Sequence, residues 1–232
     1  MAQLHAVSVT EPLPEDIFER LLVYLDPQKQ AKIRRYYHSA DALRSMVAEL
    51  LVRTMTCSGL SLLNGQLEFQ SNEWGKPYVV GIEHYHYNIS HARDWVVCAV
   101  DSEPVGVDVE YITPIDLTIA ERFFSLNEAD YLASLPTVEQ IDRFFDFWTL
   151  KESYIKAQGK GLSCTLNAFS FRFEENSEIR LQTTLDHKRC YFRQYPLDPR
   201  YKLSLCLHRN DFPVEVKVLS LHELVRQFQL YL

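Results

Sequence analysis

The chain has 232 residues, of which 47% are hydrophobic and 12% aromatic, enough to bury a core in one large domain or two small ones. Its net charge of -7 argues against general nucleic-acid binding, which typically needs a basic surface. The sequence contains no apolar run of the ~20 residues that span a bilayer, and its first residues lack the basic start and apolar block of an export signal. We therefore expect a cytoplasmic protein that binds neither membranes nor nucleic acid.

The five cysteines are an odd number, widely spaced, and form no C-x-x-C pair. They are Cys57, Cys98, Cys164, Cys190 and Cys206. This pattern is typical of free thiols in a reducing compartment rather than of a disulfide framework or a zinc site.

The first part of the chain, residues 15–63, is predicted to be mostly helical, because apolar residues recur at three- and four-residue spacing up to Gly59. Residues 67–112 instead contain short runs of β-branched and aromatic residues, separated by Gly, Pro, Asn and Asp. These runs, LEFQ, YVVG, YHYNIS, DWVVCAVD and VGVDVEYI, are predicted strands.

A second helical block follows these strands. Ser125 and Glu128 have the spacing of a capping box, which begins one helix, and residues 139–158 form a longer one. Further predicted strands then follow in AFSFRFEE, CYFRQYPL, YKLSLCLHR and VEVKVLSL. The repeated order of helix and strands indicates two halves of similar build, which divide near residues 101–106 and pack tightly because no flexible linker separates them.

The segment GVDVEYI carries the first candidate site. Asp108 and Glu110 lie two residues apart on a predicted strand, so their carboxylates share one face. Two such carboxylates suit Mg²⁺, which binds a few protein carboxylates, waters and phosphate oxygens. The alternative is a solvent-exposed sheet face that carries acidic residues without a metal ion. Taken alone, the pair of Asp108 and Glu110 favours this alternative.

The helix in WTLKESYIKAQGKG, residues 148–161, changes that balance. Trp148, Glu152 and Lys156 are spaced i, i+4 and i+8, so they form one stripe and offer a third carboxylate to the same ion. A surface Glu-Lys pair worth a few tenths of a kcal/mol explains the spacing equally well. The glycines around Lys160 are typical of a helix C-cap, although this lysine is also placed to reach a phosphate.

Further residues are candidates for binding an anion. Lys76 lies in the turn WGKPY, whose fixed geometry can aim an ammonium group. Ser90 and His91 offer a hydroxyl and an imidazole, but as neighbours on a strand they point to opposite faces and do not form a catalytic dyad. Lys29 and Lys32 belong to an early basic set that is most often a solvated helix face.

These motifs together match a known family. GVDVE followed by FWTLKESYIKAQGKGL resembles the paired signature of the 4'-phosphopantetheinyl transferases, and WGKPY and NISHA resemble the elements that precede it in the surfactin-synthetase-activating (Sfp) type. The resemblance covers nearly the whole chain. It implies an α+β fold, a single-chain pseudo-dimer of two similar α/β halves, each with a small mainly antiparallel sheet packed on a long helix. The halves would be 1–104 and 105–232, the second carrying the metal carboxylates, with the ligand site at their junction and a monomeric chain.

The resemblance also implies an activity. The enzyme would move the phosphopantetheine arm of coenzyme A onto a serine of an apo carrier protein and release 3',5'-ADP, with Mg²⁺ bound or Mn²⁺ in its place. By this resemblance Asp108, Glu110 and Glu152 hold the metal, and Asp108, Glu152 and Lys156 form the catalytic set. The expected coenzyme A-binding residues are Lys29, Lys32, Ser45, Lys76, Ser90, His91, Lys156 and Lys160.

The expected partners are apo peptidyl or acyl carrier proteins or carrier domains, in nonribosomal peptide, polyketide or antibiotic biosynthesis. Residues 111–135, which place apolar side chains beside the helix capped by Ser125, are the predicted docking surface, with core packing as the alternative. Either Glu152 or a metal-bound water is the predicted base. Two other functions stay open: a Mg²⁺-dependent hydrolase of a nucleotide diphosphate, and an inactive carrier-binding module.

Overall fold

The computed structural model describes residues 1–161, 165–174, 178–183 and 188–232. Its α-helices are α1 (Glu15–Leu22), α2 (Pro27–Arg34), α3 (Ser39–Leu60), α4 (Thr118–Phe123), α5 (Leu126–Ser134), α6 (Thr137–Gln158) and α7 (Leu221–Gln229). Its strands are β1 (Gln3–Ser8), β2 (Phe69–Ser71), β3 (Pro77–Val79), β4 (His86–Ala92), β5 (Trp95–Asp101), β6 (Val105–Tyr111), β7 (Phe169–Phe173), β8 (Ile179–Thr183), β9 (Tyr191–Gln194), β10 (Tyr201–Leu207) and β11 (Lys217–Leu219).

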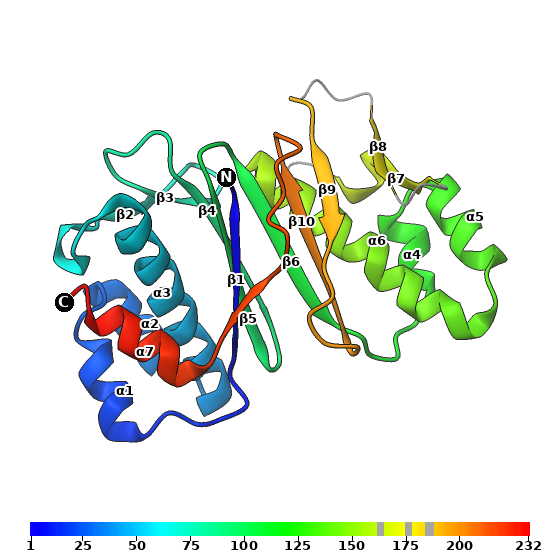
Figure 1. Ribbon diagram of the computed structural model, residues 1–232. Helices are drawn as coiled ribbons and strands as arrows, with labels where there is room; N and C mark the ends of the chain where they lie inside the picture. Colours follow the sequence, from blue (N-terminus) through cyan, green and yellow to red (C-terminus); the bar gives the residue numbers. More distant parts are fainter. Residues whose placement is uncertain (162–164, 175–177, 184–187) are drawn as a thin grey trace.

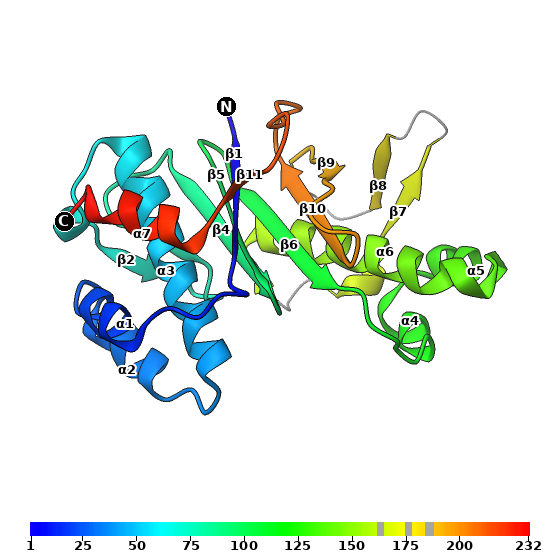
Figure 2. The same cartoon turned by 60° about the horizontal axis from the view of Figure 1, so that its bottom comes forward.

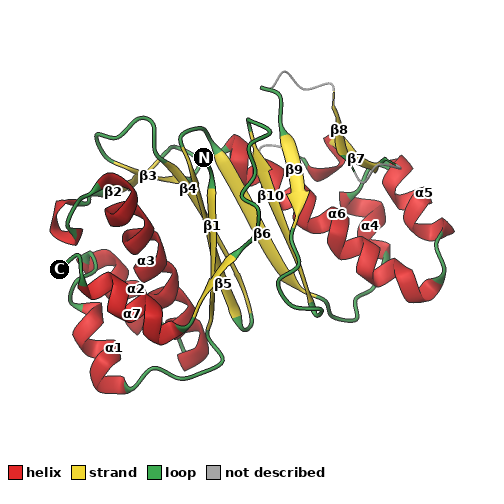
Figure 3. Ribbon diagram, viewed as in Figure 1, coloured by secondary structure: helices red, strands yellow, loops and turns green. Residues whose placement is uncertain are grey.

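Two sheets stand side by side in the middle of the molecule, with helices on both outer sides (Figures 1 and 3). The first sheet has the strand order β11-β1-β5-β4 and the second has the order β6-β10-β9. The pairs are antiparallel except that β11 runs parallel to β1. A 22-residue helix packs on each sheet, α3 on the first and α6 on the second. The predicted α+β fold of two similar halves is confirmed.

The central strands are buried on both faces, which explains their nearly continuous apolar sequence. In β5, Val96 and Cys98 face the helical core around α3, whereas Val97 and Ala99 face the second sheet. The same alternation shapes β6, where Val105, Val107 and Val109 enter the core between the two sheets. The intervening residues of β6, among them Asp108, therefore face α6.

Side chains rather than a backbone ladder join the two halves where β4 runs beside β6 (Figure 2). The amide N–H of Val107 donates to Oδ1 of Asn88 at 2.8 Å, and the N–H of Val109 donates to the hydroxyl of Ser90 at 3.3 Å. Both acceptors are buried. Since an unpaired buried N–H is costly, these bonds fix the register of one half against the other.

Gly106 allows α6 to lie directly on β6. A Cβ atom at this position would come 1.9 Å from the carbonyl oxygen of Ser153 and 2.4 Å from the amide nitrogen of Ala157. No side chain can occupy that space, so the glycine of GVDVE brings the strand with Asp108 against the helix with Lys156.

The end of the chain corrects the predicted division into 1–104 and 105–232. Strand β11 adds to the first sheet beside β1, and α7 packs against α3. Leu221, Leu224 and Phe228 complete the core of the N-terminal half. Strand β11 and helix α7 therefore belong to the N-terminal half, although they follow the C-terminal half in the sequence.

Most predicted elements are present in the structure. The helical stretch 15–63 contains α1 to α3, the helix predicted for 139–158 is α6, and the capping box of Ser125 and Glu128 begins α5. Strands β1 and β8 and helices α4 and α7 were not predicted. Within the described ranges no helix combines the length and apolar composition needed to cross a membrane.

Candidate active site

Three side chains from three elements meet at the junction of the halves. Lys156 on α6 places its ammonium nitrogen 2.6 Å from Oδ1 of Asp108 on β6 and 3.1 Å from the hydroxyl oxygen of Ser90 on β4. The hydroxyl of Ser90 donates to the same Oδ1 at 2.9 Å. The structure therefore brings together residues that are 66 positions apart in the sequence.

Asp108 is the most enclosed member of this group, with 2% of its surface exposed. Burial raises the pKa of its carboxyl group, while Lys156 and the hydrogen bond from Ser90 lower it. Its second oxygen, Oδ2, is buried and makes no hydrogen bond. A buried oxygen that lacks a partner in a charged site is a position where a cation fits.

Two further carboxylates act on Asp108. Burial, and then the charge of Asp108, raise the pKa of Glu110 to about 7, against the charge of Lys156 and a hydrogen bond with Trp148. Burial and Asp108 also raise the pKa of Glu152, and Lys156 lowers it. Asp108 thus repels both glutamates, and Lys156 lowers the pKa of all three carboxyl groups.

This donor set fits a hard divalent cation, because three carboxylates with one unpartnered oxygen are the ligands that Mg²⁺ prefers. Among the described residues no three His, Cys, Asp or Glu side chains already enclose an ion position. Lys156 instead holds the inner oxygen of Asp108. Binding of a cation would require the carboxylates to turn toward one another.

A pocket of about 290 Å³ opens beside these groups. It is lined by Trp74, Gly75, Lys76, Pro77, Asn88, Glu152, Ile155, Lys156, Gly159 and Gly161. Its walls come from the turn before β3, from β4 and from the end of α6, so both halves of the molecule contribute. The pocket connects the predicted motifs WGKPY and KESYIKAQGKG in space.

Lys76 is placed in this wall differently from the prediction. Its ammonium donates to the carbonyl oxygens of Lys156, Ala157 and Val105, at 2.7, 3.0 and 3.1 Å. Burial lowers its pKa to about 8. Since its three N–H bonds are all engaged, Lys76 ties the turn to the end of α6, and a contact with phosphate would require it to release a carbonyl.

The end of α6 has the geometry of a glycine cap. Gly159 adopts the left-handed conformation with φ 66°, and its carbonyl accepts a 2.9 Å hydrogen bond from Asn72. A Cβ atom there would lie 2.7 Å from Cδ of Lys76. The GKG segment therefore caps the helix in the structure. Lys160 follows the cap and is exposed, and its contact with a phosphate stays a prediction.

His91 lies on the basic side of the site. Partial burial, Arg44 and Lys156 lower the pKa of its imidazole. Arg44 on α3 donates to the carbonyl of Arg93 at 2.9 Å and pairs with Asp41. Arg44 could not be chosen from the sequence, where it is one more charged residue on a helix, although the predicted Ser45 is the next residue.

Lys29 and Lys32, on α2, are not joined to the carboxylates by any contact among the described residues. Lys29 pairs with Glu49 at 2.6 Å. Lys32 borders a separate surface pocket of about 480 Å³ with Arg35 and Tyr36. Like Arg44, Asn88 and Trp148 contribute to the site but were not assigned to it from the sequence.

Comparison with known proteins agrees with this geometry. A family model described as 4'-phosphopantetheinyl transferase superfamily matches residues 104–206, and one described as 4'-phosphopantetheinyl transferase, N-terminal, matches residues 11–103. The chain is 37% identical to 4'-phosphopantetheinyl transferase Sfp of Bacillus subtilis (strain 168), with 96% of this chain and 100% of that protein covered.

Two more relatives extend this similarity. One is the 4'-phosphopantetheinyl transferase psf-1 of Bacillus pumilus, 38% identical over 87% of each chain. The other is the 4'-phosphopantetheinyl transferase gsp of Aneurinibacillus migulanus, 41% identical over 73% of this chain and 70% of that protein. Because one relative is matched over its whole length and two family models cover both halves, this chain belongs to the 4'-phosphopantetheinyl transferase superfamily.

Proposed function

We propose that this protein transfers the phosphopantetheine arm of coenzyme A onto a serine of apo peptidyl or acyl carrier proteins and releases 3',5'-ADP. Family membership supports this activity, as do the names of the relatives. The structural observation that carries it is the group formed by Asp108, Ser90 and Lys156, with a buried carboxylate oxygen left open, beside a pocket at the junction of the halves.

In this proposal Asp108, Glu110 and Glu152 hold Mg²⁺, or Mn²⁺ in its place. The raised pKa values of Glu110 and Glu152 support the assignment, because burial and then the charge of Asp108 raise them, and a divalent cation would offset both effects. When bound, the ion offsets negative charge on the diphosphate of coenzyme A.

The side chains of this protein have separate tasks in the transfer. The carrier serine oxygen attacks the β-phosphorus of coenzyme A, and the bond from that phosphorus to the bridging oxygen breaks. Lys156, whose ammonium group lies at the site and is 27% exposed, donates a hydrogen bond to the phosphate that leaves. Ser90 and His91 offer further donors to the diphosphate.

Either Glu152 or a water held by the metal ion accepts the proton of the carrier serine. Glu152 lines the pocket, and burial together with the charge of Asp108 raises its pKa; a bound cation would lower that pKa again and favour the water. Trp148 lies one turn earlier on α6, stacked on Phe144, and fixes the helix that aims Glu152 and Lys156.

The carrier protein docks, in this proposal, on residues 111–135 and the adjoining start of α6. Leu126, Tyr131 and Val138 expose 83, 41 and 88% of their surfaces there, and such apolar side chains suit a partner helix. Phe124 and Leu132 belong instead to the core, with 3% exposed each. The exposed members of the segment are therefore the candidate contacts.

The oligomeric state, compartment and pathway belong to the same proposal. A monomer is supported by the apolar core that joins both sheets within one chain. A reducing cytoplasm is supported by the buried thiols of Cys57, Cys98 and Cys206. The proposed pathway is the activation of nonribosomal peptide or polyketide synthases, and neither membranes nor nucleic acid take part.

A direct test is to incubate the protein with coenzyme A, Mg²⁺ and an apo peptidyl or apo acyl carrier protein, and to weigh the intact carrier. The expected result is a gain of one phosphopantetheine, with none in the Asp108→Asn variant. Hydrolysis of coenzyme A without any carrier would support the diphosphate hydrolase instead. No gain with several carriers, and no hydrolysis, would leave only the inactive carrier-binding module.

A further inference from the structure

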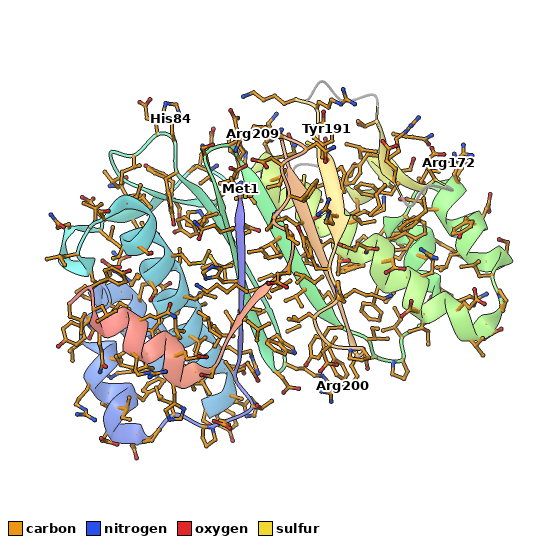
Figure 4. The ribbon with its side chains drawn as sticks, in the orientation of Figure 1. Met1, His84, Arg172, Tyr191, Arg200 and Arg209 are labelled. Atoms are coloured by element: carbon orange, nitrogen blue, oxygen red, sulfur yellow. The ribbon has the colours of Figure 1, made fainter. Side chains whose placement is uncertain are left out.

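A second group of reactive side chains lies outside the proposed active site, at the end of the second sheet. Cys190 places its sulfur 3.7 Å from Nδ1 of His208, and Nε2 of Gln158 donates to the same sulfur at 3.5 Å. In Figure 4 the neighbouring residues Tyr191 and Arg209 lie at the same end of the sheet. None of these residues has a task in the proposed transfer.

The strand register brings a second thiol to this group. Cys206 on β10 pairs with Phe192 on β9, so Cys206 and Cys190 lie on the same face, two residues apart along the strand direction. Burial, and then Cys190, raise the pKa of the Cys206 thiol, which agrees with this placement. Cys190 directly precedes the first residue of β9 and stands outside the ladder.

The two thiols differ in access. Cys206 is fully buried, whereas Cys190 is partly exposed and lines an open pocket of about 1100 Å³. The lining of that pocket includes the cations Arg143, Arg180, Arg189 and Arg193. A partly exposed thiol among cations and beside an imidazole is the environment that favours the reactive thiolate.

The imidazole of His208 also shows the effect of its pairing with Cys190. The hydrogen bond with Cys190 raises the pKa of His208, against the effect of burial. His208 Nδ1 also lies 3.2 Å from the carbonyl oxygen of Arg189, which holds the ring beside the sulfur. A protonated imidazole in this position stabilises a thiolate on Cys190.

We propose that Cys190 and Cys206 form a reversible disulfide when the protein meets hydrogen peroxide. The thiolate of Cys190 attacks one peroxide oxygen, the O–O bond breaks, and the hydroxide that leaves takes a proton from His208 to become water. The thiol of Cys206 then attacks the sulfenic sulfur and displaces a second water. Two thiols are oxidised by two electrons in all, one peroxide is reduced to two waters, and a dithiol reverses the reaction.

This disulfide would act on the wall of the active site. Gln158, which donates a hydrogen bond to Cys190, is the last residue of α6. Cys206 on β10 pairs with Gly106 on β6, and α6 rests on that glycine. The sulfurs must approach to the ~2.05 Å of a disulfide, so Cys190 leaves Gln158 as the bond forms.

The test treats the reduced full-length protein with hydrogen peroxide and maps the disulfides by mass spectrometry. The expected product has lost two hydrogens, contains a Cys190–Cys206 linked peptide and regains its mass with dithiothreitol. The Cys164→Ser variant is the matched control and should form the same link. A link from Cys190 to Cys164, or no link at all while Cys190 is oxidised, would overturn the proposal.

Two variants separate the roles of the partners. In Cys206→Ala, dimedone should trap a sulfenic acid on Cys190, because no second thiol can remove it. In His208→Gln, alkylation of Cys190 by iodoacetamide at pH 7 should slow, with its apparent pKa moved toward the ordinary ~8.5. An unchanged rate and pKa would remove His208 from the proposal, and a trapped sulfenic acid on another cysteine would overturn it. Should Cys206→Ala not fold, the mapping of the unaltered protein decides alone.

Discussion

The hydroxyl of Ser90 donates a 2.9 Å hydrogen bond to Oδ1 of Asp108, and through it the N-terminal half holds the central carboxylate of the C-terminal half. The same hydroxyl oxygen accepts the N–H of Val109 at 3.3 Å and the ammonium of Lys156 at 3.1 Å. Three groups on β6 and α6 therefore depend on one buried side chain of β4. Interface and active site are the same set of contacts in this protein.

We expect Ser90→Ala to weaken both stability and coenzyme A binding. The change leaves the N–H of Val109 without its acceptor and removes a donor from a buried carboxylate, which together cost about 1–3 kcal/mol. Urea unfolding and titration of coenzyme A in the presence of Mg²⁺ measure the two effects. Ser134→Ala is the control, because that serine is exposed and bonds only to the carbonyl of Tyr131. Equal unfolding curves for the two variants would contradict the structural role of Ser90.

Asp108→Asn should abolish transfer while the protein stays folded. The amide keeps the shape of the side chain but removes the charge that pairs with Lys156 and that is proposed to bind the metal. A loss of about a hundredfold or more in kcat is expected, together with the loss of Mg²⁺-dependent stabilisation by coenzyme A in thermal unfolding. The matched control is Asp142→Asn, which breaks a 2.6 Å ion pair with Lys202 at an exposed aspartate. Similar activity in both variants would remove Asp108 from the site.

How far the sequence predicts this site depends on the kind of contact. The shared face of Asp108 and Glu110 follows from the period of a strand, and the stripe of Glu152 and Lys156 follows from the period of a helix. Each is local, and each is present in the structure. That the two faces meet rests on Gly106, whose missing side chain lets the helix approach the strand. Periodicity alone contains no information on that approach.

Residues with two tasks show the other limit. Glu128 caps α5 as predicted, yet it also forms a 2.8 Å ion pair with Lys151 and accepts the N–H of Phe171, all within the core. Lys76 was expected to face a phosphate and instead holds the end of α6. In both cases the residue type was informative, but its partner comes from a distant part of the chain and is set by tertiary packing.

Glu110 makes the metal-free protein less stable as the pH rises toward neutrality. In the folded state its pKa is raised to about 7 from the ordinary 4.5 of a glutamate, so between these values the folded protein keeps a proton that the unfolded chain has lost. The unfolded state then binds fewer protons, and the free energy of unfolding falls as the pH rises from about 4.5 to about 7. Urea unfolding between pH 5 and 8 with a chelator present measures this slope.

Glu110→Gln should flatten that dependence, because the amide does not titrate. Glu103→Gln, at an exposed carboxylate 41% accessible to solvent, serves as the control and should keep the slope of the unaltered protein. If the free energies of unfolding of Glu110→Gln and of the unaltered protein change with pH in the same way, the raised pKa does not belong to Glu110.

Gly106→Ala should be the most destabilising small substitution in the junction. The added Cβ would lie 1.9 Å from the carbonyl oxygen of Ser153 and 2.4 Å from the nitrogen of Ala157, both backbone atoms of α6 that cannot move independently. Overpacking of this kind costs about 3 kcal/mol or more and separates Asp108 from Lys156. Gly65→Ala is the matched control, because nothing lies within 4 Å of its added Cβ. Thermal unfolding should show a large drop for Gly106→Ala alone, with transfer activity lost in any part that stays folded. A melting temperature equal to that of Gly65→Ala would mean that α6 does not rest on β6 at this glycine.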